Sequence, residues 1–254
     1  MYLRTSLYKF VVLALTCLLL SFEALASYEQ QIETLLSEIA EETKAPSLSV
    51  AVAHNGELLA AAASGFADKK SGTQATPNTQ YRTGSIAKVI GTTAFMKLVD
   101  KGKVSLQDPI KKYLPYLPSH YDEIKIVHLF THTSGIRHYR FGEYGTNIHY
   151  PTIELATRVF RDDELEFSPG TGYVYSTYGI NMIQGVIEAV TGKSLKQYLD
   201  DELFYLVGMN STTPEIKGQD KRTYATGYRS FLSNLPVHDI DVSNKYIGGG
   251  MRST

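Results

Sequence analysis

The sequence predicts an α+β fold in which an antiparallel sheet flanked by helices is joined to an all-α lobe. Three observations lead to this prediction: a hairpin pattern at residues 48–64, an apolar helix at residues 85–100, and helical patterning from Asp108 to about Leu206. A hairpin and an apolar helix each need a second layer to cover them, so we expect the sheet and the helices to pack as layers. With 254 residues, the chain can bury a sizeable core.

The N-terminus has the pattern of a secretory signal. A short basic stretch precedes an apolar run at residues 10–22, and Ala24 and Ala26 form the A-x-A pattern that allows cleavage after Ala26. A membrane anchor is the alternative, but a spanning helix needs roughly 20 apolar residues. We therefore expect residues 1–26 to be removed as a signal peptide. Residues 27–254 would then form one exported domain, periplasmic or secreted, with no membrane span.

The charge balance and the single cysteine exclude several kinds of partner and site. Lys and Arg number 25 against 26 Asp and Glu, so no overall field attracts nucleic acid or an anionic membrane. Cys17 lies inside the signal, which leaves the mature domain without a thiol for a disulfide, a nucleophile or a metal site. We expect a small-molecule or peptide substrate and no metal or cofactor.

Helical and strand periodicity define the first elements after the signal. Residues 28–43 place four apolar side chains at helical spacing, which predicts an amphipathic helix with one buried stripe. Alternating apolar residues then flank Asn55-Gly56, a pair that favours the tight turn of a hairpin. The stripe consists of Ile32, Leu35, Leu36 and Ile39.

The helix predicted from Ser85 to Asp100 is apolar nearly all round, so we expect it to run through the interior. Helical segments with short Gly and Pro interruptions then continue to about residue 206. Ser194 and Gln197 have the pattern of a capping box that opens the last clear helix. Thr191-Gly192-Lys193, just before it, looks like the end of the preceding helix.

Ser85 and Lys88 are the candidate catalytic pair. Because residues at i and i+3 share one face of a helix, the hydroxyl and the amine can meet. The helix N-terminus favours the charge that develops on the hydroxyl, and burial disfavours a charged amine, so Lys88 can serve as the base for a Ser85 nucleophile. The alternative is a Ser85 N-cap beside a solvated Lys88. The apolar helix argues against this alternative, because Lys88 has no evident wet face.

Four segments form an ordered series of motifs: residues 81–88 (YRTGSIAK), 129–136 (LFTHTSGI), 167–171 (FSPGT) and 175–179 (YSTYG). In order and spacing they resemble the penicillin-recognising, serine β-lactamase-like family, of the class C β-lactamase and D,D-peptidase type. The resemblance covers nearly all of the chain after the signal and is greatest to the mitochondrial type and its bacterial relatives. It implies a β-lactamase/transpeptidase-like fold and a serine hydrolase that forms a covalent acyl-enzyme.

The resemblance also implies roles for two residues of the helical lobe. In the family a tyrosine faces the serine-lysine pair and shuttles the proton to the leaving group, and Tyr175 matches it by position. Taken alone, without the resemblance, Tyr175 would be interpreted as a half-exposed packing residue. The family usually has an asparagine two residues later, which bonds both the substrate carbonyl and the lysine, whereas this chain has Thr177. A substrate-binding Thr177 hydroxyl cannot reproduce both contacts, which favours a peptidase or esterase over a true β-lactamase.

The third motif of the family, Lys or His followed by Thr or Ser and Gly, does not occur after Thr177. Lys70-Ser71-Gly72 has the letters but precedes Ser85 in a turn-rich stretch, so we predict a surface turn there. Residues 248–254 resemble an interior segment of the family, which favours a truncated domain without its C-terminal strands. We expect such a chain to be inactive and poorly stable, with two strands of sheet and only the Ser85 half of the oxyanion hole.

Rival sites receive little support from the sequence. His128 and His132 have a zinc-ligand spacing, but Leu129 stands where a zinc protease needs its glutamate, so we interpret both as structural. The chain has no Gly-x-Ser-x-Gly elbow and no phosphate-binding loop around residues 192–194. The alternative function is a non-catalytic penicillin-binding-like module or a self-assembling scaffold that keeps the fold without turnover.

Overall fold

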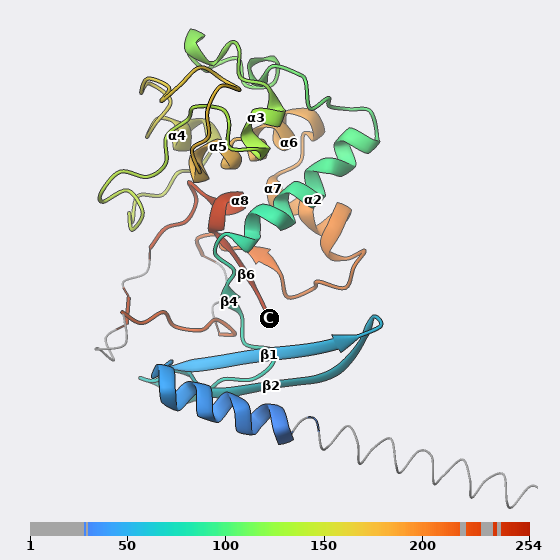
Figure 1. Cartoon of the computed structure of the whole chain (residues 1–254), viewed down its shortest axis with the longest axis vertical. Coiled ribbons are helices and arrows are strands. Elements are labelled where there is room, and N and C mark those ends of the chain that lie inside the picture. The colour runs from blue at the N-terminus through green and yellow to red at the C-terminus, as the bar shows by residue number, and fades with distance from the viewer. Residues whose placement is uncertain (1–27, 29, 219–221, 230–235, 238–239) are drawn as a thin grey trace, which may run out of the picture. The chain divides into compact units, whose positions relative to one another are not determined.

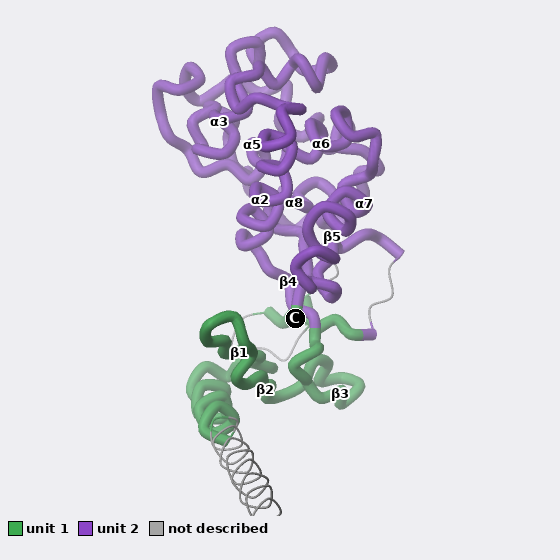
Figure 2. The backbone as a smooth tube through the Cα atoms, turned by 90° about the vertical axis from the view of Figure 1, so that its right-hand side faces the viewer, with its two compact units in different colours: residues 1–79, 223–237, 254 green, residues 80–222, 238–253 purple. Residues whose placement is uncertain are grey.

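The computed structural model describes residues 28, 30–218, 222–229, 236–237 and 240–254. The expected signal peptide lies outside these residues. The chain forms two compact units, shown in green and purple in Figure 2: residues 1–79, 223–237 and 254, and residues 80–222 and 238–253. Within the described ranges, no helix is both long enough and apolar enough to cross a bilayer.

The first unit contains the predicted hairpin. Its strands are β1 (Ser47–His54), β2 (Glu57–Asp68) and β3 (Thr73–Gln74), paired antiparallel in the order β1-β2-β3. The turn residues Asn55 and Gly56 have φ of 50° and 82°, as a primed turn requires. Residues 70–72 form an exposed turn, as predicted. A helix at residues 30–43 runs alongside the hairpin (Figure 1).

The buried stripe predicted for the helix at residues 30–43 is only partly correct. Leu36 is buried, but Leu35 and Ile39 are exposed. The helix lies beside two long strands and a third of only two residues, and so narrow a sheet covers just part of its apolar face. The spacing of apolar residues predicts the helix correctly, but it does not predict how many of these side chains are buried.

The second unit is predominantly helical, as the sequence predicts for its α lobe (Figure 1). A small antiparallel sheet in the order β4-β6-β5 accompanies the helices. The strands are β4 (Tyr81–Arg82), β5 (Thr213–Pro214) and β6 (Met251–Ser253). The helices are α2 (Ile86–Asp100), α3 (Ile126–Phe130), α4 (Ile153–Thr157), α5 (Thr177–Asn181), α6 (Ile183–Thr191), α7 (Leu195–Leu199) and α8 (Tyr246–Gly249). Single turns occur at η1 (Ile110–Lys112), η2 (Ser119–Tyr121) and the π-helical η3 (Asp200–Phe204).

Several local signals in this unit are confirmed. Ser194 and Gln197 form the predicted capping box at the start of α7. Gly192 ends α6 with φ of 67°, the left-handed conformation that glycine adopts most easily at a helix terminus. Pro109 directly precedes η1, where the sequence places the start of a new element.

Helix α2 is buried along one face rather than all round. Lys88, Phe95 and Leu98 lie on the buried face, whereas Ile86 and Val89 are 64% and 67% exposed. The prediction of an interior helix is therefore wrong for these two side chains, although both are apolar. Residues 86 and 89 are three apart and share the face opposite the core, where no described segment covers them.

Close packing of α2 against α8 brings the two ends of the unit's sequence together. A Cβ added to Gly91 of α2 would lie 2.5 Å from Cγ2 of Ile247, a fully buried side chain of α8. Only glycine at position 91 permits this approach without moving α8. The core continues from this contact through α5, α6 and α7, with Tyr178, Ile183, Val186 and Tyr198 among its fully or almost fully buried side chains.

We expect Gly91→Ala to destabilise the protein by about 1–3 kcal/mol, because the added methyl group overpacks the contact with Ile247. This loss outweighs the gain in helix propensity, which is about 1 kcal/mol. Ile247→Ala alone leaves a cavity, but the double variant should be more stable than the sum of the single losses predicts. Denaturant unfolding of all four proteins measures this coupling. Strict additivity would contradict the close contact.

Candidate active site

Ser85 lies at the N-terminus of α2. It occupies the N-cap position but makes no side-chain capping bond. Its Oγ instead lies 2.8 Å from the Tyr175 hydroxyl and accepts a hydrogen bond from Lys88 Nζ at 3.2 Å. Ser85 is therefore the N-cap residue by position but does not cap the helix, because its hydroxyl bonds two side chains and not the helix backbone.

Lys88 is buried, with 8% of its surface exposed, so it is not the solvated cation of the alternative. Besides Ser85, its Nζ donates to the Thr177 hydroxyl at 3.2 Å and to the backbone carbonyl of Gly248 at 2.5 Å. Three acceptors match the three N–H groups of an ammonium. The amine also lies 4.8 Å from the centre of the Tyr175 ring.

Tyr175 lies just before α5, and the pKa of its phenol is shifted. Burial raises the pKa of the Tyr175 phenol, but hydrogen bonding with Lys88 and Ser85 and the charge of Lys88 outweigh burial, so the net pKa is lowered. Lowering the pKa of a phenol increases the fraction that is ionised near neutral pH, and the ionised form is the one that can accept a proton. Tyr175 can therefore take part in proton transfer with the Ser85 hydroxyl.

Two histidines hold the backbone that follows Tyr175. His132 Nδ1 accepts from the Ser176 amide at 3.3 Å, and His138 Nδ1 accepts from the Thr177 amide at 3.2 Å. Both rings also pack on Tyr175, with centroid distances of 4.6 and 5.4 Å. Each imidazole therefore satisfies an amide at the start of α5 and supports the tyrosine ring. His132 and His138 fix the direction in which Tyr175 points.

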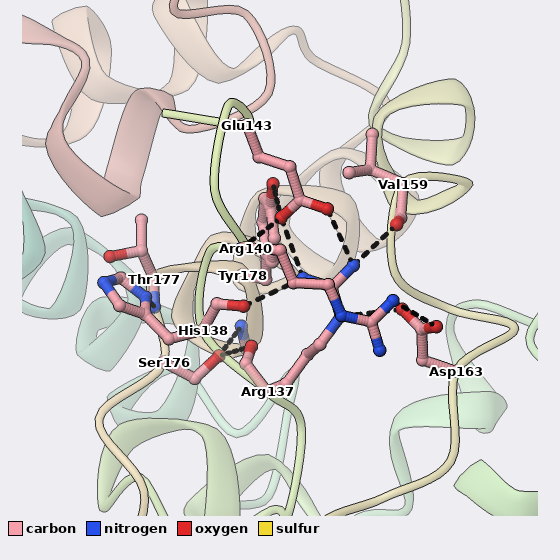
Figure 3. A network of polar contacts seen from close by, with 10 residues as sticks. Arg137, His138, Arg140, Glu143, Val159, Asp163, Ser176, Thr177 and Tyr178 are labelled. Atoms are coloured by element: carbon pink, nitrogen blue, oxygen red, sulfur yellow. Dashed lines mark hydrogen bonds and ion pairs between the residues drawn. The ribbon is translucent and has the colours of Figure 1, made fainter. Parts of the chain in front are cut away.

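Arg137 anchors the loop that carries His138 (Figure 3). Its guanidinium makes a bidentate ion pair with Glu143, a bond to Asp163 at 2.7 Å, and a bond to the Val159 carbonyl. Its own carbonyl accepts a hydrogen bond from Ser176 Oγ at 2.8 Å, and the same Oγ caps α5 by accepting from an amide one turn on. The network therefore connects the α5 N-terminus to a buried, ion-paired arginine.

The structure brings the four residues singled out from the sequence, Ser85, Lys88, Tyr175 and Thr177, into one cluster. Sequence reasoning missed the Gly248 carbonyl, because a backbone acceptor carries no residue signature. It also gave His132 and His138 no part in the site, although they are the first and last residues of the run HTSGIRH at 132–138. His128 Nδ1 accepts from the Lys125 amide at a helix N-terminus. Across the described residues, no three His, Cys, Asp or Glu side chains are grouped to hold a metal.

The histidines lead us to expect a stability that decreases in acid. Burial, and then the charge of Lys88, lower the pKa of His132 and His138 below the ordinary 6.5. Because the folded state binds fewer protons than the unfolded chain near this pH, stability falls as the pH drops below about 6.5.

Replacing both histidines by asparagine tests this expectation. In His132→Asn/His138→Asn, each Oδ1 takes the place of Nδ1 as an acceptor but does not titrate. The melting temperature of the double variant should therefore change less than that of the wild type between about pH 7 and about pH 5. Calorimetry across this range compares the two slopes. Equal slopes would show that neither histidine is linked to folding.

Residues 32–254 match the Beta-lactamase family. Among curated proteins, the putative penicillin-binding protein PbpX of Bacillus subtilis is 30% identical over 203 residues, which are 78% of this chain and 49% of PbpX. Protein flp of Staphylococcus aureus strain MW2 is 27% identical over 204 residues, 79% of this chain and 41% of flp. The chain thus spans less than half the length of either relative.

Solved structures show the same fold. The octameric penicillin-binding protein homologue from Pyrococcus abyssi superposes with a TM-score of 0.73 at 26% identity, covering 89% of this chain and 53% of the homologue. A class C β-lactamase gives 0.74 at 22% identity, with coverage of 89% and 61%. EstCE1, a hydrolase with promiscuous acyltransferase activity, gives 0.75 at 24% identity, with coverage of 91% and 70%. Because residues 32–254 match the family model and the fold is β-lactamase/transpeptidase-like, the chain belongs to the β-lactamase family.

Proposed function

We propose that this chain belongs to a serine hydrolase that works through a covalent acyl-enzyme on Ser85. The observation that carries the proposal is that Ser85 Oγ is within hydrogen-bond distance of both the Tyr175 hydroxyl and the Lys88 amine. A serine is a weak nucleophile until a neighbouring group takes its proton, and here two such groups converge on one oxygen. Membership of the β-lactamase family supports the same reaction class.

In the proposed reaction, Ser85 Oγ attacks the substrate carbonyl carbon while its proton passes to the Tyr175 phenolate oxygen. The sequence assigns the base to Lys88, and we propose that the two residues share this task. Lys88 helps to lower the pKa of the Tyr175 phenol, and Tyr175 carries the proton. Collapse of the tetrahedral intermediate breaks the bond to the leaving group, which takes the proton from Tyr175. Water then attacks the acyl carbon and releases Ser85 by the reverse proton transfer.

Thr177 is the residue from which we infer the preferred class of substrate. Its hydroxyl accepts from Lys88 Nζ, so one of the two contacts that an asparagine makes in the family is retained. A hydroxyl has no second polar arm for the substrate carbonyl. We therefore propose that the enzyme favours peptides or esters over β-lactams. The solved relatives include both class C β-lactamases and a hydrolase with acyltransferase activity, which agrees with this range of carbonyl substrates.

A non-catalytic role is the second candidate. The similarity to an octameric penicillin-binding protein homologue favours it, as does the departure from the family pattern at Thr177. Such a module would keep the fold for assembly or ligand binding without turnover. A covalent probe distinguishes the two roles, because only the enzyme needs a reactive serine.

We expect a serine-directed phosphonate to label Ser85 in the full-length protein. Ser85→Ala and Lys88→Ala should both abolish labelling, because the nucleophile and the groups that activate it act as a unit. Ser71→Ala is the matched control and should label normally, since Ser71 lies in an exposed turn where its hydrogen bonds are to Asp68 and Thr73. Peptide mass spectrometry locates the adduct. Labelling that survives in Ser85→Ala would exclude the mechanism.

Thr177→Asn should raise turnover of β-lactams relative to simple esters. The new amide can bond Lys88 and the substrate carbonyl together, and such a bond contributes roughly 1.5–3 kcal/mol, or about ten-fold or more in rate. Thr177→Val has the shape of threonine without the hydroxyl, so it should lose activity toward both substrate classes. Comparing nitrocefin with an ester substrate gives the ratio. An unchanged ratio in Thr177→Asn would refute this role of Thr177.

A further inference from the structure

The carbonyl of Gly248 is held against Lys88 by a very short helix. Helix α8 has four residues and no side-chain cap at its N-terminus. The first amides of any helix have no partner within it, so Ile247 and Gly248 must find acceptors elsewhere. Both residues are buried, which makes unpaired amides costly. Whatever supplies these acceptors also determines where the Gly248 carbonyl lies.

Asn181 supplies them. Its Oδ1 accepts from the Ile247 amide at 3.0 Å and from the Gly248 amide at 3.3 Å. Its Nδ2 donates to the Asn244 carbonyl at 3.0 Å. The side chain is buried, at 2% exposure, and directs both ends of its amide at the segment 244–248. No other residue type of this size offers an acceptor and a donor in this arrangement.

Two residues of α5 therefore influence the position of the Lys88 amine, one directly and one indirectly. Thr177, in its first turn, accepts from Lys88 directly, and Asn181, one turn later on the same face, holds the segment that presents Gly248. Thr177 and Gly248 are also in contact, because a Cβ on Gly248 would lie 2.3 Å from Cγ2 of Thr177. The Gly248 carbonyl thus sits in a position set by two residues of one helix.

We infer that Asn181 is a positioning residue for the reaction, which fixes the Gly248 carbonyl on Lys88 and thereby holds the Lys88 amine against Ser85. The inference rests on the proposed function. The Asn181 side chain hydrogen-bonds the backbone of segment 244–248 and acts through it. Removing its acceptor frees the Gly248 carbonyl to shift, and Lys88 then loses one of the three oxygens that orient it.

Asn181→Leu tests the inference while keeping a side chain of similar size. We expect the second-order rate of phosphonate labelling at Ser85, and kcat for an ester, to fall about ten-fold or more, as misplaced catalytic groups cause. KM should be nearly unchanged, since Asn181 is buried away from the substrate. Asn181→Asp keeps the acceptor for both amides and should recover most of the lost rate, even if Asn181→Leu folds poorly.

Gln184→Leu is the matched control. Gln184 is a buried amide of the neighbouring helix α6 whose side chain bonds Glu188 and not segment 244–248. It should lose stability without the selective fall in kcat. Hydrogen exchange at the amides of Ile247 and Gly248 should accelerate in Asn181→Leu but not in Gln184→Leu.

These measurements distinguish a failure of the proposed function from a failure of the role inferred for Asn181. If the wild-type protein is not labelled at Ser85, the proposed function fails, and the inference fails with it. If the wild type is labelled and Asn181→Leu reacts at the wild-type rate, only the inference fails. A fall in Asn181→Leu that Asn181→Asp does not recover, or that Gln184→Leu matches, would assign Asn181 a purely structural role.

Discussion

The arrangement of the site depends on how the buried amine of Lys88 is satisfied. A charge removed from water is costly unless other groups pair with it and bond it. Among the described residues, the partners of Lys88 are two hydroxyls, one backbone carbonyl and the face of a tyrosine ring, and none is a carboxylate. The counter-charge that the amine lacks at rest can come from Tyr175, whose pKa is lowered beside it. In the proposed reaction, the Tyr175 phenolate that takes the Ser85 proton would therefore lie beside a buried amine that has no carboxylate partner among the described residues.

The surrounding structure holds these partners of Lys88 in place. His132 and His138 support the Tyr175 segment, and the buried Arg137 ties that support to Glu143 and Asp163 through part-buried ion pairs. Removing both carboxylates would leave the buried Arg137 guanidinium without a counter-charge, which is costly. Together, His132, His138 and Arg137 hold the start of α5 in place.

Much of this could be predicted from the sequence, and the limits have physical causes. The Asn55-Gly56 turn, the capping box at Ser194 and the pairing of Ser85 with Lys88 depend on neighbours within four residues, which periodicity and capping rules describe. The proximity of Tyr175 and Thr177 followed only from family resemblance. The exposure of Ile86 and Val89, and the roles of Gly248 and Asn181, depend on which distant segments happen to pack there. Local patterns carry no information on such contacts.

The close approach of α2 and α8 at Gly91 also determines when the site can exist during synthesis. Ser85 and Tyr175 are separated by 90 residues, and Lys88 and Gly248 by 160. Contacts between segments so far apart form late, after the loop between them has closed, and a nascent chain has its serine and lysine long before it has α8. Until α8 docks, the Lys88 amine lacks the Gly248 carbonyl that accepts a hydrogen bond from it. Lys88 therefore acquires its full set of acceptors only after the segment that contains α8 has been made and has packed against α2.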